Sequence, residues 1–208
     1  MKIIIITRPE FFEGETALVN RLFEQGKIER LHLRKPKATE QQMAGWIEQI
    51  ALPFRHLIVL HDHHQLAYSY KLGGIHLNSR NPDVPMWTEE LRSQETLQNA
   101  VLPQAGTASL WGNFTISRSC HSLNEVRRYK KECDYLFLSP IYDSISKEGY
   151  GAAFSREELA EAKGEGLLQD NVIALGGISP DKLAEVELSG FAGAAMLGAF
   201  WQENIPRQ

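Results

Sequence analysis

Two glycine-bearing segments near the end of the chain have the residue types and spacing of a phosphate site. Gly176 and Gly177 directly follow one short apolar run, and Leu197 and Gly198 close another. A glycine leaves its backbone N–H uncovered, and clustered backbone N–H groups bind phosphate oxygens. If the two runs are the last two strands of an eight-stranded α/β barrel, their exits lie where such barrels bind phosphate. The segments therefore predict a phosphorylated small molecule as the ligand.

Polar and charged side chains also follow the other apolar runs. The predicted site residues at these positions are Arg34, His61, Asp62, Ser119, His121, Ser144, Ser146 and Lys147. The carboxyl ends of all barrel strands open on one face, so we expect these side chains to converge there. Hydroxyl, guanidinium and ammonium groups together suit a phosphate ester or a pyrophosphate.

The elements that must position these residues alternate between strands and helices. Eight short apolar runs have the composition of buried parallel strands, at 2–7, 30–33, 57–61, 74–77, 114–117, 135–139, 172–175 and 194–197. Helix signals stand between them, including Ser-x-x-Glu capping boxes that begin at Ser122 and Ser155. This alternation predicts a compact (β/α)8 TIM barrel formed by residues 1–208 as a single domain. The alternative is an open doubly wound sheet, but no Gly-x-Gly-x-x-Gly motif follows the first run.

The connection over residues 78–113 fits this pattern less well. Pro82, Pro85 and Pro103 interrupt it, and we expect a helix only over residues 88–100. It has neither the composition of a linker nor a second core, so the prediction keeps one domain. Two roles stay open for this segment, a cover over the pocket or a contact between subunits.

His121 has the position of a general base. It directly precedes Ser122, the expected cap of a helix, and the positive end of that helix disfavours protonation of the imidazole. A neutral imidazole at pH 7 can take up a proton and return it. The alternative is a histidine that only bonds the backbone at the helix entry.

The run His61-Asp62-His63-His64 has the residue types of a transition-metal site. Neighbouring residues at a strand end point in different directions, however, and no well-spaced ligand set accompanies the run. We therefore expect no transition metal here, and expect His61 and Asp62 to line a pocket for a ring.

The composition argues against several kinds of partner. A net charge of −4 with scattered basic residues disfavours nucleic acid and anionic membranes. No segment has the roughly 20 apolar residues that a membrane helix needs. Cys120 and Cys133 give neither a disulfide framework nor a metal-ligand spacing, so a cytoplasmic location is expected.

Several of these residues together resemble the thiamine phosphate synthase/TenI family. The family's loop Gly-Pro-Ile/Val-Phe-x-Thr-x-Thr-Lys is similar to the segment that ends in Ser144, Ser146 and Lys147. Arg34 matches the arginine of an Arg-Glu-Lys element, and Ser119 matches the serine of a Ser-x-His-Thr/Ser element. The resemblance implies a (β/α)8 barrel, a homodimer and a thiazole phosphate as ligand.

The same resemblance implies roles for further residues. The amides of Gly176 and Gly177 would meet the thiazole phosphate, and Gly198 stands where the family usually has serine. Synthase members use Mg²⁺ to join a hydroxymethylpyrimidine pyrophosphate to the thiazole phosphate. TenI-like members isomerise a thiazole phosphate carboxylate without a metal, and the histidine that matches His121 shuttles the proton.

The opposite half of the implied pocket departs from the synthases. Their Asn-Asp pair is His61-Asp62 here, their second metal carboxylate is Asn81, and the lysine of Arg-Glu-Lys is Pro36. Since Mg²⁺ prefers carboxylate oxygens, these changes favour a thiazole tautomerase that needs no cofactor. The alternatives are a synthase with Mg²⁺ on Asp62, and a non-catalytic binder of thiazole or thiamine phosphates that acts in regulation.

Overall fold

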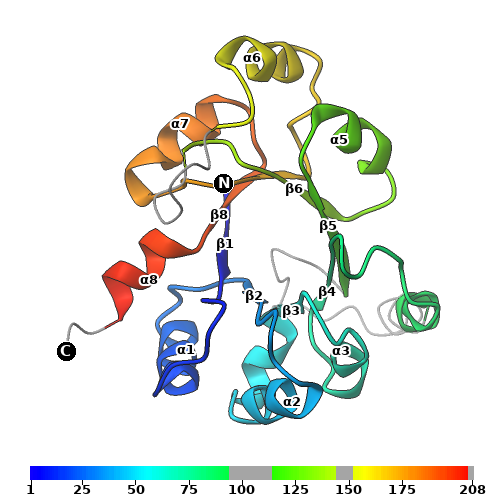
Figure 1. Ribbon diagram of the computed structural model, residues 1–208, viewed down its shortest axis with the longest axis vertical. Helices are drawn as coiled ribbons and strands as arrows, with labels where there is room; N and C mark the ends of the chain where they lie inside the picture. The colour runs from blue at the N-terminus through cyan, green and yellow to red at the C-terminus, as the bar shows by residue number, and fades with distance from the viewer. Residues whose placement is uncertain (94–113, 144–151, 206–208) are drawn as a thin grey trace, which may run out of the picture.

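Eight parallel strands form a closed barrel. The computed structural model describes residues 1–93, 114–143 and 152–205, and within them the strands pair in sequence order, with β8 closing onto β1 (Figure 1). The strands are β1 (Lys2–Ile6), β2 (Leu31–Leu33), β3 (Ile58–Leu60), β4 (Gly74–Leu77), β5 (Thr115–Cys120), β6 (Tyr135–Leu138), β7 (Val172–Leu175) and β8 (Gly193–Met196). The predicted (β/α)8 barrel is confirmed, and each of the eight apolar runs overlaps one strand.

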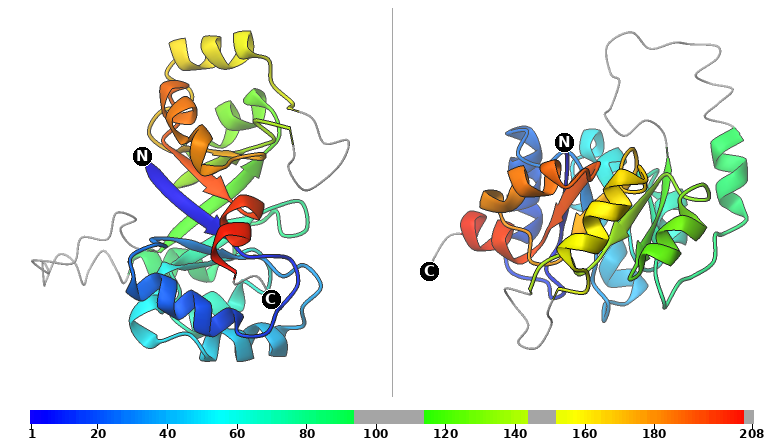
Figure 2. Two further views of the ribbon diagram at one scale, coloured as in Figure 1. Left: turned by 90° about the vertical axis from the view of Figure 1, so that its left-hand side faces the viewer. Right: turned by 90° about the horizontal axis from the view of Figure 1, so that it is seen from above.

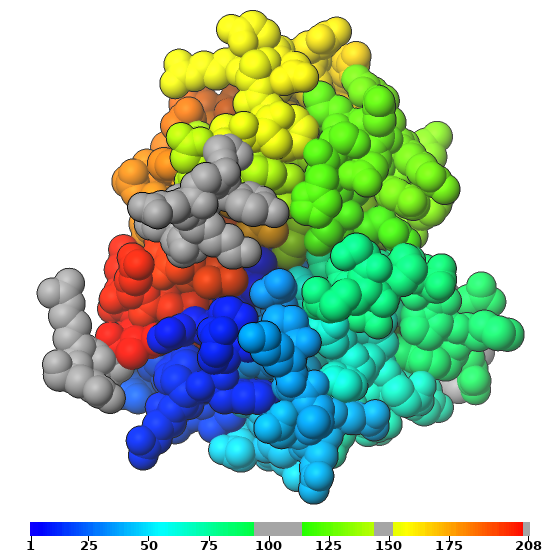
Figure 3. Space-filling model, in the orientation of Figure 1, coloured from blue at the N-terminus to red at the C-terminus, as the bar shows by residue number. Residues whose placement is uncertain are grey.

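Helices surround the strands on the outside (Figure 1, Figure 2). They are α1 (Glu15–Glu24), α2 (Glu40–Glu48), α3 (Gln65–Ser69), α5 (Leu123–Tyr129), α6 (Arg156–Gly164), α7 (Leu183–Leu188) and α8 (Gly198–Asn204), with 3-10 turns at Leu52–Leu57 and Pro180–Lys182. Residues 87–93 are helical, as expected for the start of the helix in the long connection. The segments follow one another around the face in Figure 3, so that the red α8 lies beside the blue N-terminal segment. No helix in the described part of the chain is long and apolar enough to cross a membrane.

The two capping boxes that the sequence predicts differ in the structure. At α6 the box is complete, because Ser155 Oγ accepts from the Glu158 N–H at 3.1 Å and Glu158 Oε2 accepts from the Ser155 N–H at 2.8 Å. At α5 only half of it forms. Ser122 Oγ accepts from the Glu125 N–H at 3.2 Å, but the Glu125 carboxylate accepts instead from the His121 N–H at 2.5 Å. The backbone of His121 is thereby fixed to the first turn of α5.

Replacing the cap residue Ser155 by alanine is expected to destabilise the protein by about 1 kcal/mol, because the first turn of α6 loses a backbone partner. Urea unfolding of the wild type and the variant measures the difference. Ser69→Ala is the matched control, since the Ser69 hydroxyl donates to the Gln65 carbonyl within α3 and caps nothing. Equal losses of stability in both variants would contradict the capping role.

The interior of the barrel has an apolar half and a polar half. The apolar half is formed by Ile4, Ile6, Tyr135, Phe137, Ile173 and Ala195. The polar half comes from β2 to β5 and contains His32, His61, His76, Ser117 and Ser119. A larger apolar core separates the sheet from the helices. Branched apolar side chains dominate ordinary barrel interiors, so the polar half of this interior is a departure from the usual pattern.

β5 runs further than the sequence predicts. The apolar run ends at 117, but the strand continues because Ser119 and Cys120 pair with Phe137 and Leu138 of β6. Ser119 therefore belongs to a strand, and the ladder fixes the direction of its side chain.

Candidate active site

Three charged side chains that follow β2, β3 and β4 interact with one another: Arg34, Asp62 and Arg80. Arg80 donates from Nε to Asp62 Oδ1 and from Nη2 to Asp62 Oδ2, both at 3.0 Å. Burial lowers the pKa of Arg34, as does the charge of Arg80, whereas Asp62 opposes the shift. The guanidinium groups of Arg34 and Arg80 lie near the Asp62 carboxylate, and Glu10 adds a second negative charge near Arg34. Guanidinium forks suit the oxygens of a phosphate.

The Asp62 carboxylate does not fit a Mg²⁺ ion as the structure holds it. Asn81 Nδ2 also donates to Asp62 Oδ1 at 3.0 Å, so both oxygens of Asp62 already accept from N–H donors. Mg²⁺ demands oxygen ligands in octahedral geometry. Among the described residues, Asp62 belongs to no group of three or more carboxylate, histidine or cysteine side chains that could hold an ion. The chain supplies Arg80 where the resemblance implies a metal.

Replacing Arg80 by alanine is expected to raise the affinity of the protein for Mg²⁺ about tenfold. Both oxygens of Asp62 lose a charged donor, and hydrogen bonds to charged groups are worth roughly 1.5–3 kcal/mol. Calorimetric titration with MgCl₂ measures the change. Arg127→Ala is the control, because Arg127 pairs with Glu165 at an exposed position. The same Mg²⁺ affinity in all three proteins would contradict the competition between Arg80 and the ion.

Lys35 turns away from the ligand side. Its ammonium group donates to both carboxylate oxygens of Glu15, at 2.7 and 2.8 Å, and to the Glu10 carbonyl at 2.8 Å. The residue is 1% exposed. Lys35 flanks Pro36, which replaces the lysine of the Arg-Glu-Lys element, but its contacts commit it to the N-terminus of α1.

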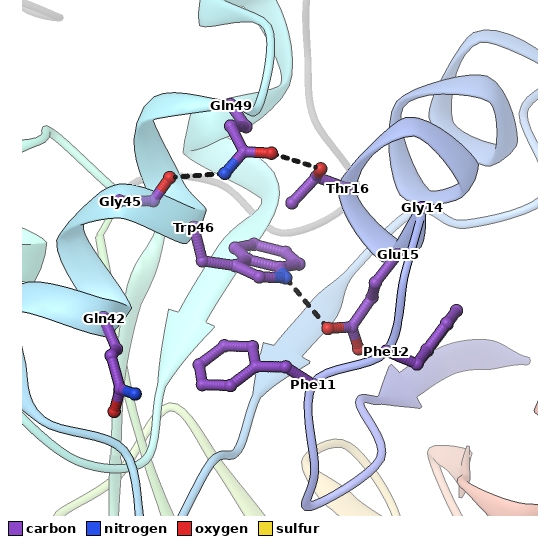
Figure 4. Close-up of a pocket in the computed structure, with 9 residues that line it drawn as sticks. All are labelled: Phe11, Phe12, Gly14, Glu15, Thr16, Gln42, Gly45, Trp46 and Gln49. Carbon is purple, nitrogen blue, oxygen red and sulfur yellow. Dashed lines mark hydrogen bonds between the residues drawn. The ribbon is translucent and has the colours of Figure 1, made fainter.

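A cavity of about 350 Å³ lies between α1 and α2 (Figure 4). Phe11 and Trp46 line it, and Trp46 Nε1 donates to Glu15 Oε2 at 3.0 Å. Thr16 and Gln49 meet at its side through a 2.9 Å hydrogen bond. Since both oxygens of Glu15 already accept hydrogen bonds, the cavity offers no free carboxylate for chemistry.

His121 presents one basic nitrogen. Its Nδ1 lies 3.1 Å from the Ser139 carbonyl oxygen. A carbonyl can only accept, so Nδ1 donates in this contact, and in the neutral imidazole Nε2 is then the acceptor. No described residue hydrogen-bonds Nε2, and the side chain is exposed. The backbone bond of the alternative interpretation is present, and it leaves the second nitrogen available as a base.

A hydrogen-bonded chain ends at Ser119. Ser117 Oγ donates to the Ile75 carbonyl at 3.2 Å, and so it accepts from His76 Nδ1 at 2.9 Å. The other nitrogen of His76 then accepts from the Ser119 hydroxyl at 2.8 Å. Because its proton is committed to His76, Ser119 offers a ligand only acceptor lone pairs.

His61 lies inside the barrel, whereas the next residue, Asp62, faces Arg80. His61 Nε2 is 2.9 Å from His32 Nδ1, and His32 Nε2 is 2.7 Å from the Tyr135 hydroxyl. Burial lowers the pKa of His32 and His61 well below the ordinary value and that of His76 to about 3. All three imidazoles are therefore neutral at pH 7.

The glycine exit of β7 packs directly against the loop that follows β6. Gly176 has φ +99° and Gly177 has φ +64°, in the left-handed region that favours glycine. A Cβ on Gly176 would lie 2.8 Å from Pro140 Cα, and one on Gly177 would lie 2.8 Å from Tyr142 Cβ. The Gly177 N–H donates to no acceptor among the described residues.

The other predicted phosphate residues stand at the start of α8. Leu197 is the N-cap of this helix and Gly198 is its first residue. The Leu197 side chain packs on the apolar half of the interior, so only its backbone is available. The predicted substrate residues Ser144, Ser146 and Lys147 lie outside the described residues.

Comparison with known proteins places this barrel in a family. The family profile described as thiamine monophosphate synthase matches residues 3–200. The chain belongs to this family. The crystal structure of thiamine phosphate pyrophosphorylase from Bacteroides thetaiotaomicron is 36% identical with a TM-score of 0.76, covering 97% of this chain and 85% of that one. The same-named protein of Pyrococcus furiosus, at 20% identity and a TM-score of 0.65, covers 95% and 86% and supports the fold alone.

Curated relatives of this thiamine monophosphate synthase family member are more distant. The thiamine-phosphate synthases of Bacillus velezensis and Limosilactobacillus fermentum are each 24% identical to it, over 76% and 77% of this chain. The matches span 60% and 66% of those proteins, less than two thirds of their length. The resemblance that the site residues indicate is confirmed at the level of the family.

Sequence patterns gave no role to His32 and His76, two residues of the family member's interior. Each stands between two apolar residues of a strand, as in Leu31-His32-Leu33, which is the pattern of an inward side chain in a barrel whose other face packs on helices. The same pattern in the strands on either side of His61 indicates both residues. Arg80 was missed because its pairing with Asp62 joins two separate loops.

Proposed function

We propose that the protein is a thiamine phosphate synthase, which joins a hydroxymethylpyrimidine pyrophosphate to a thiazole phosphate. The observation that carries this proposal is the 36% identity to the Bacteroides thetaiotaomicron pyrophosphorylase over 97% of the chain. The curated relatives, which are named for the same activity, support it further. In the reaction the thiazole nitrogen forms a bond to the pyrimidine methylene carbon, and the bond from that carbon to the pyrophosphate oxygen breaks.

The thiazole phosphate is assigned to the exits of β7 and β8. The amides of Gly176, Gly177 and Gly198 would donate to its oxygens, with the Leu197 backbone shaping the turn. The support is the open Gly177 amide and the start of α8, because helix N-termini attract anions. Ser144, Ser146 and Lys147 complete this half of the proposed site.

The departing pyrophosphate is assigned to the side of the barrel opening that carries Arg34 and Arg80. Arg34 and Arg80 would bind its oxygens, and Ser119 would accept a hydrogen bond from the pyrimidine. The support is the pair of guanidinium groups near Asp62, and the Ser119 hydroxyl proton, which is donated to His76 and leaves the Ser119 oxygen to accept. Arg80 hydrogen-bonds both oxygens of Asp62, so in this proposal the guanidinium charge of Arg80, and no metal, lies beside the leaving group.

A second candidate is the thiazole tautomerase, in which His121 moves a proton within a thiazole phosphate carboxylate. The observation that favours it is the lone pair on His121 Nε2, set by the bond from Nδ1 to the Ser139 carbonyl. The pairing of Asp62 with Arg80 also suits a reaction that needs no metal. The phosphate half of the site would be the same.

One experiment separates these candidates. The purified protein is given pyrimidine pyrophosphate and thiazole phosphate, with Mg²⁺ or with a chelator, and in parallel the non-aromatic thiazole phosphate carboxylate. Release of pyrophosphate only when both substrates are present supports the synthase. Aromatisation that is lost in His121→Gln supports the tautomerase, and binding without turnover in either assay supports a regulatory binder.

Further properties belong to this proposal. The chain would fold as one domain, act as a homodimer and work in the cytoplasm on small phosphorylated molecules, with neither nucleic acid nor membrane as a partner. The unpaired thiols of Cys120 and Cys133 suit a reducing compartment. Light scattering during gel filtration tests the dimer, and a monomeric mass would contradict it.

A further inference from the structure

Three imidazoles from neighbouring strands gather inside the barrel. His32 of β2, His61 after β3 and His76 of β4 are 0%, 4% and 0% exposed. One ring nitrogen of each lies within 4.8 Å of the other two. The ring centroids of His61 and His76 are 4.2 Å apart, and the His32 centroid lies 5.1 and 5.3 Å from them. These three side chains are called the histidine cluster below.

We propose that the histidine cluster binds a divalent transition metal ion such as Zn²⁺, through one nitrogen of each imidazole. Zinc–nitrogen bonds of about 2.0–2.1 Å at tetrahedral angles place ligand nitrogens about 3.4 Å apart. His32 Nδ1 and His61 Nε2 are 2.9 Å apart, and no separation in the set exceeds 4.8 Å. An ion would replace the hydrogen bond between His32 and His61 and draw the three nitrogens to this spacing.

In two of the three imidazoles, His32 and His76, the nitrogen that would not bind the ion already has a hydroxyl partner. When His32 binds through Nδ1, its Nε2 keeps the Tyr135 hydroxyl at 2.7 Å. Whichever nitrogen of His76 binds, Ser117 or Ser119 remains on the other. Metal-bound imidazoles almost always hydrogen-bond through the free nitrogen, which fixes the ring and its tautomer. The barrel thus contains an outer shell as well as a ligand set.

The chemistry of the histidine cluster selects the class of ion. Imidazole nitrogen suits Zn²⁺, Cu²⁺ and Ni²⁺, whereas Mg²⁺ requires oxygen. Three protein ligands leave the fourth position of a tetrahedral ion to water or to a ligand. Ser119, which is half-buried and bonded to His76, links the cluster to the mouth of the barrel.

This site is independent of the proposed synthase activity, and it differs from the site that the run at His61 first indicated. His63 Nε2 lies 2.9 Å from the Ala38 carbonyl, and Asp62 is held by Arg80, so both point away from His61. The partners of His61 come instead from β2 and β4. The competing account is a metal-free hydrogen-bonded network that only fills the polar half of the barrel.

The first test uses the full-length wild type after treatment with a chelator. Titration with Zn²⁺ against a chromophoric competitor is expected to show one tight site per chain. X-ray absorption at the zinc edge is expected to show three imidazoles at about 2.0–2.1 Å. No binding, or a shell with fewer than three imidazoles, would overturn the proposal.

Variants then locate the site. His32→Gln and His76→Gln are expected to lower Zn²⁺ affinity at least about 100-fold, and Tyr135→Phe about tenfold, as the loss of an outer-shell partner does. His63→Gln and the exposed His56→Gln are the controls and should bind as the wild type does. Circular dichroism checks that each variant is folded. If His32→Gln or His76→Gln unfolds, the Zn²⁺ affinity of Tyr135→Phe and the X-ray absorption spectrum of the wild type test the assignment instead. A loss in His63→Gln equal to that in His32→Gln would overturn the assignment.

Discussion

Replacing Gly177 by alanine is expected to weaken binding of the thiazole phosphate, and with it turnover, by about 100-fold, as a displacement of 1 Å in a binding site does. The new Cβ would lie 2.8 Å from Tyr142 Cβ and closer still to the Asp143 carbonyl oxygen. At φ +64° a side chain is strained whatever the space. The turn must therefore move, and the Gly177 amide moves with it. Calorimetric titration with the thiazole phosphate measures the loss.

Gly164→Ala is the matched control for this substitution. Gly164 lies in α6, its φ is not in the left-handed region, and a Cβ there would meet no atom within 4 Å. This variant is expected to bind as the wild type does and to gain roughly 0.5–1 kcal/mol of stability. Normal binding by Gly177→Ala would show that the amide does not contact the phosphate.

Replacing Lys35 by methionine is expected to destabilise the protein by about 3–5 kcal/mol at pH 7, because it leaves a buried carboxylate without its partner. Glu15 is 2% exposed, and both of its carboxylate oxygens accept hydrogen bonds from the Lys35 ammonium group. Urea unfolding at pH 7 measures the loss. The double variant Lys35→Met with Glu15→Gln is expected to recover most of it, since glutamine is neutral and still accepts from Trp46 Nε1.

The loss in Lys35→Met is also expected to depend on pH. Burial raises the pKa of Glu15 even with Lys35 present, and removing Lys35 raises it further. An acid whose folded pKa lies above its unfolded value binds its proton more tightly in the folded state, so stability falls as pH rises through that window. The variant should therefore approach the wild type as pH falls from 7 towards 4.5. A loss that is the same at pH 5 and pH 7 would contradict a buried, unpaired charge.

Patterns local in the sequence predicted most of the fold. The apolar runs identified all eight strands because each must be buried on both faces, and Ser155 with Glu158 predicted a real capping box. The glycine exit of β7 was predicted as a phosphate site, and the structure adds that Gly176 also admits the backbone of Pro140. What the sequence could not supply was the direction of side chains at strand ends.

Directions depend on the register between strands and on partners far along the chain. Lys35 adjoins Arg34 in sequence, yet it turns to Glu15 because a buried carboxylate requires a cation. His61 adjoins Asp62, yet it faces His32 because alternate residues of a strand face opposite sides. Glu125 bonds His121 instead of Ser122, a choice between two neighbouring amides that no capping pattern distinguishes. Each of these contacts needs three-dimensional information.

The most direct test of the proposed function is phosphorus-31 NMR of the purified protein mixed with hydroxymethylpyrimidine pyrophosphate and thiazole phosphate. The synthase proposal predicts that the signals of the pyrimidine pyrophosphate ester give way to free pyrophosphate as the thiazole phosphate signal becomes that of thiamine phosphate. Neither change should occur when one substrate is left out. An unchanged spectrum from a folded protein that binds thiazole phosphate would contradict the proposal.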